Sequence, residues 1–117
     1  MKALSVRQPW ASRILRGEKR IEVRSWATSY RGPLLICATH RPRLAGYPTG
    51  VALCVVELID CRPMRREDER AAGVAFLSGA YAWVLGNVRP IAPFPISGRL
   101  GLFQVEVPSP SGQASLF

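Results

Sequence analysis

The sequence has little of what metal centres, cofactor sites and membrane spans require. Its one histidine, His40, has no partner motif, which favours a turn residue over a ligand. Its three cysteines are odd in number and lack the spacing of metal ligands. No apolar run approaches the roughly 20 residues that a spanning helix needs. We therefore expect no metal, no cofactor and no association with a membrane.

The N-terminus also lacks the apolar segment of a signal peptide, so a cytoplasmic location is expected. In a reducing compartment the cysteines should be free thiols. Cys37 and Cys54 lie in apolar runs, and this predicts that both are buried as small hydrophobic side chains.

Acidic residues are scarce. Eight Asp and Glu face sixteen Lys and Arg, fourteen of them Arg, which leaves a formal charge of +8 and a pI near 10.5. Arginine suits bidentate contact with phosphate and stacking on bases, so this balance favours a polyanionic partner, above all nucleic acid. The alternative is an arginine-biased composition with no such partner, and charge alone does not separate the two.

The hydrophobic patterning predicts a mainly β chain. At 117 residues, without internal repeats, one domain is expected. A strand at 81–85 is expected to continue after a turn at 86–87, and Pro90, Pro93 and Pro95 predict a stiff extended link. The other predicted elements are strands at 3–6, 19–24, 34–38, 51–61 and 100–107, a helix at 7–16 and a short charged helix at 65–72.

Five or six strands, with one clearly patterned helix and one weakly patterned helix, predict a mainly β, or α+β, fold. Short strands of uneven spacing with few helices are typical of a small closed or partly closed barrel decorated by helices.

The stretch from Gly17 to Arg24 combines acids and bases with two β-branched residues. In a strand, Ile21 and Val23 should point into a core, while Arg20, Glu22 and Arg24 share the other face. Gly17 supplies the left-handed residue that commonly ends a helix. The alternative is a solvated strand face with a paired Glu and Arg.

The same stretch carries a family motif. Gly17, Lys19, Glu22 and Arg24 match the G-x-K-x-x-E-x-R hallmark of the ASCH domain, a member of the PUA-like superfamily of small β-barrels. The flanking segments at 4–11, 25–26 and 30–34 resemble the family as well, and so do the later segments at 81–85 and 98–103. The resemblance implies a barrel over residues 1–107, with a cleft lined by the hallmark residues.

The family is proposed to bind RNA or modified nucleobases in that cleft. Lys19 and Arg24 would donate to a phosphate or base carbonyl, Glu22 would accept from an exocyclic amine, and Trp26 would stack on a splayed base. RNA is read through unstacked bases of this kind. The nucleic-acid-binding residues expected are Arg7, Gln8, Trp10, Lys19, Glu22, Arg24, Trp26 and Arg31.

The resemblance also implies an enzymatic alternative. Some distant members hydrolyse the amide of N4-acetylcytidine nucleosides with a Lys, Thr and Glu set, and a few are reported as ribonucleases. Lys19 is kept here, but Glu22 stands where the threonine nucleophile would be. Lys19 and Glu22 are the candidate catalytic pair, since a buried lysine beside a carboxylate can transfer protons. A third alternative is a Lys–Glu–Arg network that only fixes the mouth of the barrel.

The C-terminal residues 108–117 are expected to form a loose tail. Its last five residues, QASLF, resemble the peptide by which bacterial DNA-polymerase and repair proteins dock on the sliding clamp. Leu116 and Phe117 would enter an apolar pocket of that partner while Gln113 bonds at its rim. The alternative is that Leu116 and Phe117 fold back onto the barrel. A clamp partner would favour DNA over RNA.

Overall fold

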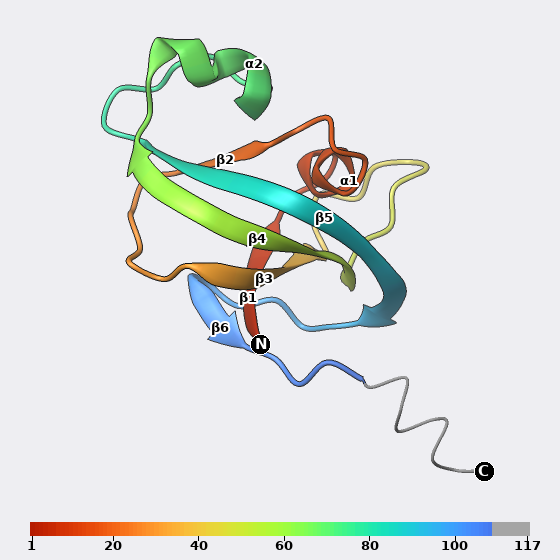
Figure 1. Ribbon diagram of the computed structural model, residues 1–117. Helices are drawn as coiled ribbons and strands as arrows, with labels where there is room; N and C mark the ends of the chain where they lie inside the picture. Colours follow the sequence, from red (N-terminus) through yellow and green to blue (C-terminus); the bar gives the residue numbers. More distant parts are fainter. Residues whose placement is uncertain (109–117) are drawn as a thin grey trace, which may run out of the picture.

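The computed structural model describes residues 1–108, and it folds them into one curled sheet with two short helices (Figure 1). The tail residues Gln113, Leu116 and Phe117 lie outside the described residues. The elements are β1 (Lys2–Val6), α1 (Trp10–Leu15), β2 (Ile21–Arg24), β3 (Gly32–Ala38), β4 (Val51–Pro63), the 3-10 turn η1 (Arg66–Asp68), α2 (Glu69–Ala72), β5 (Tyr81–Pro95) and β6 (Leu102–Gln104).

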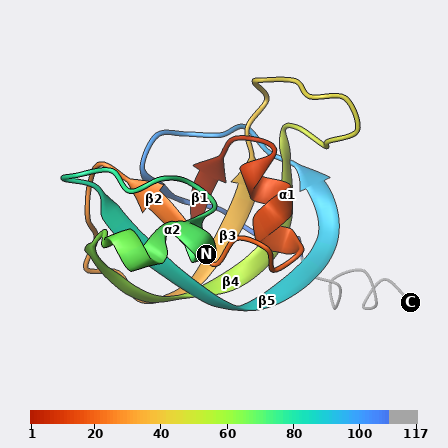
Figure 2. The ribbon, with the colours of Figure 1, turned by 90° about the horizontal axis from the view of Figure 1, so that it is seen from above.

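The six strands follow the order β2-β5-β4-β3-β1-β6. All neighbours are antiparallel except β1 and β3, which run parallel with Ser5 opposite Cys37. The sheet curls into an open barrel, and Figure 2 shows β5 bending around one side of it. This confirms the prediction of a small barrel of five or six strands carrying one or two short helices.

Helix α1 fills the inside of the curl (Figure 2). Its residues Ala11 and Ile14 are buried against core side chains of β1, β3, β4 and β5, with Trp83 the largest of them. Gly17 ends the helical segment with φ +76°, as its position predicts. Cys37 and Cys54 are buried, which confirms their predicted role as core residues.

Strand β5 differs from the sequence-based prediction. The turn predicted at 86–87 and the extended link predicted after it were wrong, because β5 runs unbroken from Tyr81 to Pro95. Asn87 takes a left-handed conformation, φ 51°, near an irregularity in the pairing with β4, so the segment bends without reversing. Strand β2 pairs only as far as Val84, which leaves the later part of β5 bordered by β4 alone. A free edge tolerates prolines, since it needs no N–H donor.

Two smaller predictions need correction. The last strand is Leu102–Gln104, shorter than the predicted 100–107. The short charged helix predicted at 65–72 is the 3-10 turn η1 followed by α2, and its Asp68 is buried, where Arg62 holds it through two hydrogen bonds of 2.7 and 2.9 Å. No helix among residues 1–108 has the length and apolar character to cross a membrane.

Candidate functional site

A pocket of about 780 Å³ opens at the edge of the sheet where β1 and β3 end. Parallel neighbours finish at the same edge, so the residues after β1 and those after β3 meet there. Strand β2 and two later loops complete the walls. The lining residues are Ser5, Val6, Arg7, Trp10, Lys19, Glu22, Val23, Arg24, Ser25, Trp26, Thr39, His40, Arg41, Val74, Arg99, Leu100 and Gly101.

Lys19, Glu22 and Arg24 form one connected network in this pocket. The Glu22 carboxylate accepts from Arg24 Nε at 2.9 Å and lies 3.6 Å from Lys19 Nζ. Arg24 also donates to the carbonyl of Ser5, and Lys19 donates to the carbonyl of Ala72. Since β2 and β1 are not neighbours in the sheet, the Arg24–Ser5 bond links two distant strands. The network therefore has a structural role, as one of the sequence-based alternatives proposed.

The network is buried, and this excludes the alternative of a solvated strand face. Lys19 is 3% exposed and Glu22 is 8% exposed. Burial lowers the pKa of Lys19 because it disfavours the ammonium, while the nearby Glu22 carboxylate acts in the opposite direction. Ile21 packs in a separate apolar cluster on the other face of β2, as predicted, whereas Val23 contacts that cluster and also lines the pocket. Arg20 is exposed and does not line the pocket.

Trp10 is occupied by the protein's own cations. Lys19 Nζ lies 5.2 Å from the centre of its ring, and the guanidinium carbon of Arg13 lies 5.1 Å from it. Both distances fit cation–π contacts. Trp10 lines the pocket, but its contacts favour a role in holding Lys19 over one in stacking on a base.

Trp26 is the better placed indole. It is partly exposed, lines the pocket and makes an edge-to-face contact with Trp83, with ring centres 4.8 Å apart and planes at 81°. Trp83 Nε1 donates to the Trp26 carbonyl at 3.2 Å, which holds the loop after β2 against the core. Trp26 is therefore a positioned aromatic side chain at the pocket wall.

Six of the eight residues predicted to bind nucleic acid come together in this pocket, and two do not. Gln8 is buried, where it accepts from the Ser12 amide and donates to the Pro48 carbonyl at 2.8 Å. It anchors the segment before β4. Arg31 is exposed beside Asp60, at 3.4 Å, and does not line the pocket. The six that do are Arg7, Trp10, Lys19, Glu22, Arg24 and Trp26.

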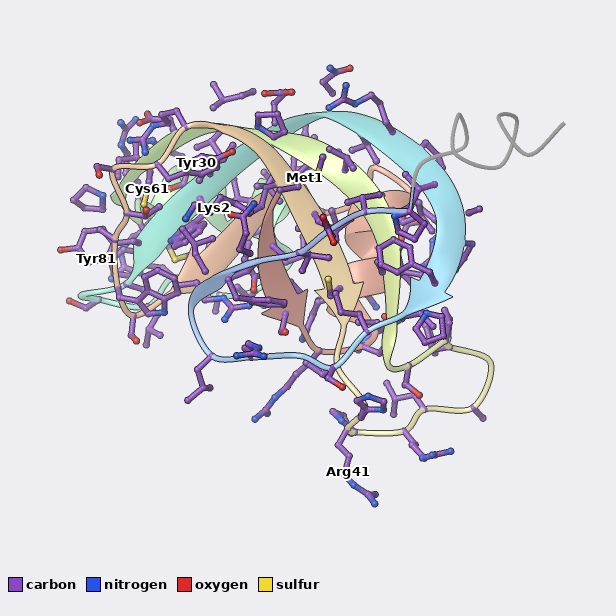
Figure 3. All side chains as sticks on the ribbon, turned by 90° about the horizontal axis from the view of Figure 1, so that it is seen from below. Met1, Lys2, Tyr30, Arg41, Cys61 and Tyr81 are labelled. Carbon is purple, nitrogen blue, oxygen red and sulfur yellow. The ribbon has the colours of Figure 1, made fainter. Side chains whose placement is uncertain are left out.

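Sequence reasoning missed the part of the pocket that later segments supply. Thr39, His40 and Arg41 follow β3, and Arg99 lies in the loop before β6. His40 was interpreted as a turn residue, and it does follow a strand, but its side chain lines the pocket. In Figure 3, Arg41 projects outward from this segment, at the outer rim. The parallel pairing of β1 with β3, which brings these residues in, has no local signal.

The pocket is strongly basic. Its lining includes five Lys and Arg side chains and a single acid, Glu22. Lys19 and Arg24 share that acid, whereas Arg7, Arg41 and Arg99 form no ion pair with any residue in the range 1–108. The inner cations are thus neutralised by the protein, and the exposed outer ones are available for an anionic ligand.

Comparison with known proteins identifies the family. The model of the ASCH domain matches residues 4–95. The chain belongs to the ASCH domain family. The match of this ASCH domain covers all the hallmark residues, from Gly17 to Arg24, and therefore the inner part of the pocket.

Two curated relatives are the mouse and human proteins named Activating signal cointegrator 1 (Mus musculus and Homo sapiens). Each is 33% identical to this ASCH domain over an alignment of 127 positions, which covers 88% of this chain and 22% of the relative. The chain thus spans about a fifth of the length of the curated relatives it matches.

Solved structures support the fold. The crystal structure of an ASCH protein from Zymomonas mobilis has a TM-score of 0.67 and 17% identity, and covers 98% of this chain and 92% of that one. A mutant of the same protein has a TM-score of 0.66 and 18% identity, and the match covers 98% of this chain and 94% of the mutant chain. At this level of identity, the likeness establishes the barrel architecture.

Proposed function

We propose that this ASCH domain binds an unpaired nucleotide of RNA in the pocket at the ends of β1 and β3. The observation that carries the proposal is the convergence of a positioned indole, a buried carboxylate and several arginines on one pocket of about 780 Å³, where Arg7, Arg41 and Arg99 have no ion-pair partner among residues 1–108. A volume of this order suits a small organic ligand. The net charge of +8 favours a polyanion, in line with the same assignment.

In this proposal the parts of the pocket have separate roles. Trp26 stacks on the splayed base, since base–aromatic stacking contributes about 1–3 kcal/mol in single-strand binders. Glu22 accepts from Arg24 and forms an ion pair with Lys19, and a carboxylate with about four lone-pair sites retains capacity for a base amine. Arg7, which is exposed, contacts the phosphate backbone of the RNA in this proposal. The Lys19 ammonium, held by Ala72 and Glu22, keeps the carboxylate in place.

The test is the binding of a short single-stranded RNA, measured by fluorescence anisotropy at low salt. Arg7→Gln removes an unpaired pocket cation, and Arg31→Gln is the matched control, an exposed arginine outside the pocket. Arg7→Gln should weaken binding about three- to tenfold, as expected for one charge-assisted contact. The control should stay close to the wild type. Equal affinity of all three proteins would contradict the proposal.

A hydrolytic role on nucleosides or RNA is a second candidate. It is favoured by one observation, the position of the buried Lys19. Burial lowers the pKa of Lys19, and its Nζ lies 3.6 Å from the Glu22 carboxylate. Against it, the Lys19 ammonium already donates to Ala72 and lies against Trp10. Incubation with N4-acetylcytidine and with single-stranded RNA tests this candidate, and turnover that is lost in Lys19→Met would favour it over simple binding.

Several predictions extend this function. Docking of Gln113, Leu116 and Phe117 on a sliding clamp stays a prediction, and so do the cytoplasmic location and the boundary between a domain at 1–107 and a tail at 108–117. A pull-down with purified clamp, with and without the last five residues, tests the docking. Equal recovery would contradict it.

A further inference from the structure

A second, smaller compartment adjoins the main pocket. Its volume is about 280 Å³, and all but one of its lining residues also line the main pocket, so the two are continuous. Its lining residues are Ser5, Thr39, His40, Gly98, Arg99 and Leu100. None of them is acidic, and only Ser5 lies within a strand, next to the last residue of β1.

One wall of the compartment is firmly held by backbone hydrogen bonds. Thr39 N donates to the Val6 carbonyl at 3.1 Å, and Gly50 N donates to the Ala38 carbonyl at 2.9 Å. The His40 ring packs directly on Gly50, since a Cβ there would lie 2.3 Å from its Cε1. The imidazole therefore has a defined place beside the compartment, although its side chain is exposed.

The opposite wall brings the backbone of Gly98 against Ser5. A Cβ on Gly98 would lie 2.7 Å from Ser5 Oγ, so a side chain larger than hydrogen would displace that hydroxyl. Ser5 Oγ is buried and has no hydrogen-bond partner among the described residues. Buried polar atoms are nearly always partnered, and an exception at a pocket wall points to a partner from outside the chain.

The charge of the compartment indicates the chemistry of that partner. Arg99 is exposed and forms no ion pair with another residue in the range 1–108. The compartment thus offers a free guanidinium, an imidazole and the hydroxyl of Ser5, with no carboxylate among its lining residues. The Thr39 hydroxyl already donates to the Arg41 carbonyl. Guanidinium and hydroxyl donors are the groups that bind phosphate oxygens in nucleic-acid complexes.

We propose that this compartment holds a phosphodiester group of the strand whose unpaired nucleotide occupies the main pocket. The inference rests on the proposed function and deepens it. It assigns phosphate contact to Arg99 and His40, which lie outside the family hallmark, and it makes the ligand a nucleotide within a strand in preference to a free nucleobase or nucleoside.

The first experiment measures the affinity for single-stranded RNA over a range of salt concentrations. Arg99→Gln should raise Kd about three- to tenfold and reduce the slope of log Kd against log salt by about 0.7, the value for one phosphate contact to a single strand. The matched control is Arg89→Gln, which removes an equal charge from an exposed ion pair with Glu57, outside both pockets. It should change neither quantity.

The second experiment separates geometry from charge. Gly98→Ala leaves the net charge unchanged. Gly98 does not have a positive φ, so its backbone conformation accepts an alanine. Its methyl group would narrow the compartment at Ser5, so Gly98→Ala should weaken RNA binding at least threefold. Ser5→Ala should weaken binding while leaving the urea midpoint unchanged or raised, because it removes a buried hydroxyl without a partner. A lowered midpoint with unchanged binding would contradict the assignment.

The third experiment identifies the source of the phosphate. Backbone amide shifts of Ser5, Thr39 and His40 are followed by NMR during titration with the four nucleosides, their 5′-monophosphates and inorganic phosphate. A nucleotide should shift these amides, whereas a nucleoside should shift only the inner pocket around Trp26. Equal shifts with inorganic phosphate alone would mean that the compartment takes a free anion, and the strand-phosphate proposal would be wrong.

The outcomes separate the two proposals. If RNA binding depends on Arg7 but Arg99→Gln behaves like Arg89→Gln, the phosphate compartment is wrong and the proposed function stands. If the wild-type protein binds no RNA, both fail. If both arginines matter and Gly98→Ala also weakens binding, both are supported.

Discussion

Replacing Glu22 by Gln tests the buried network most directly. Glu22 is the one acid that the pocket offers to Lys19 and Arg24, and its side chain is 10% exposed. Gln keeps the size of the side chain and one acceptor oxygen but removes the charge. The ammonium of Lys19, 3% exposed, would then be buried without a counterion.

The expected loss of stability is substantial. Removing one partner of a buried ion pair costs about 3–5 kcal/mol, because the remaining charge stays desolvated. We expect about 3 kcal/mol, the lower end, because Arg24 is 23% exposed and Lys19 retains its bond to Ala72. With a slope of about 2 kcal/mol per molar urea, the unfolding midpoint should fall by about 1.5 M.

Equilibrium urea unfolding, followed by tryptophan fluorescence, measures this change. Glu18→Gln is the matched control, since Glu18 pairs with Arg16 at 2.9 Å and both are about half exposed. The control should shift stability by less than about 0.5 kcal/mol. Adding Lys19→Met to Glu22→Gln should recover part of the loss, because the orphaned charge is removed.

The result that would refute the reasoning is a Glu22→Gln variant as stable as Glu18→Gln. The Lys19 ammonium would then be solvated in solution, and the structural role of the network would be wrong. A loss of stability without rescue by Lys19→Met would locate the cost elsewhere, in the bond from Arg24 to Glu22.

The remaining predictions concern three other buried groups, the Asp68 carboxylate and the thiols of Cys37 and Cys54. Arg62 holds the pKa of Asp68 at about 2, below the ordinary 3.8, so this pair stabilises the fold above pH 3.8 and its contribution is lost as the pH falls towards 2. Acid unfolding of Asp68→Asn should lack that part of the pH dependence, and an unchanged profile would contradict the pairing. Burial raises the pKa of Cys37 and Cys54 to about 12, so a thiol reagent at mildly alkaline pH should modify only Cys61 in the native protein and all three in denaturant. Fast reaction of all three in the native state would contradict their burial.

Local patterns were sufficient where one element decides the outcome. The alternation of Ile21 and Val23 with Glu22 and Arg24 predicts the two faces of β2. The structure places Ile21 in an apolar cluster and Glu22 and Arg24 in the pocket, and Val23 contacts both. Gly17 ends the helical segment as predicted. The prediction failed for β5, where proline and glycine spacing indicated a turn and a link. Whether a strand tolerates prolines depends on the neighbour it has, and β5 has a free edge beyond Val84.

The sequence by itself determined the family, the mainly β architecture and the inner pocket residues, because the hallmark lies in one short segment whose geometry is local. Only the tertiary structure decided that Gln8 and Arg31 lie away from the pocket, that Lys19 is buried, and that His40, Arg41 and Arg99 join it. The physical reason is the pairing of β1 with β3 and the curl of the sheet, which bring together residues far apart in the chain, such as Arg7 and Arg99.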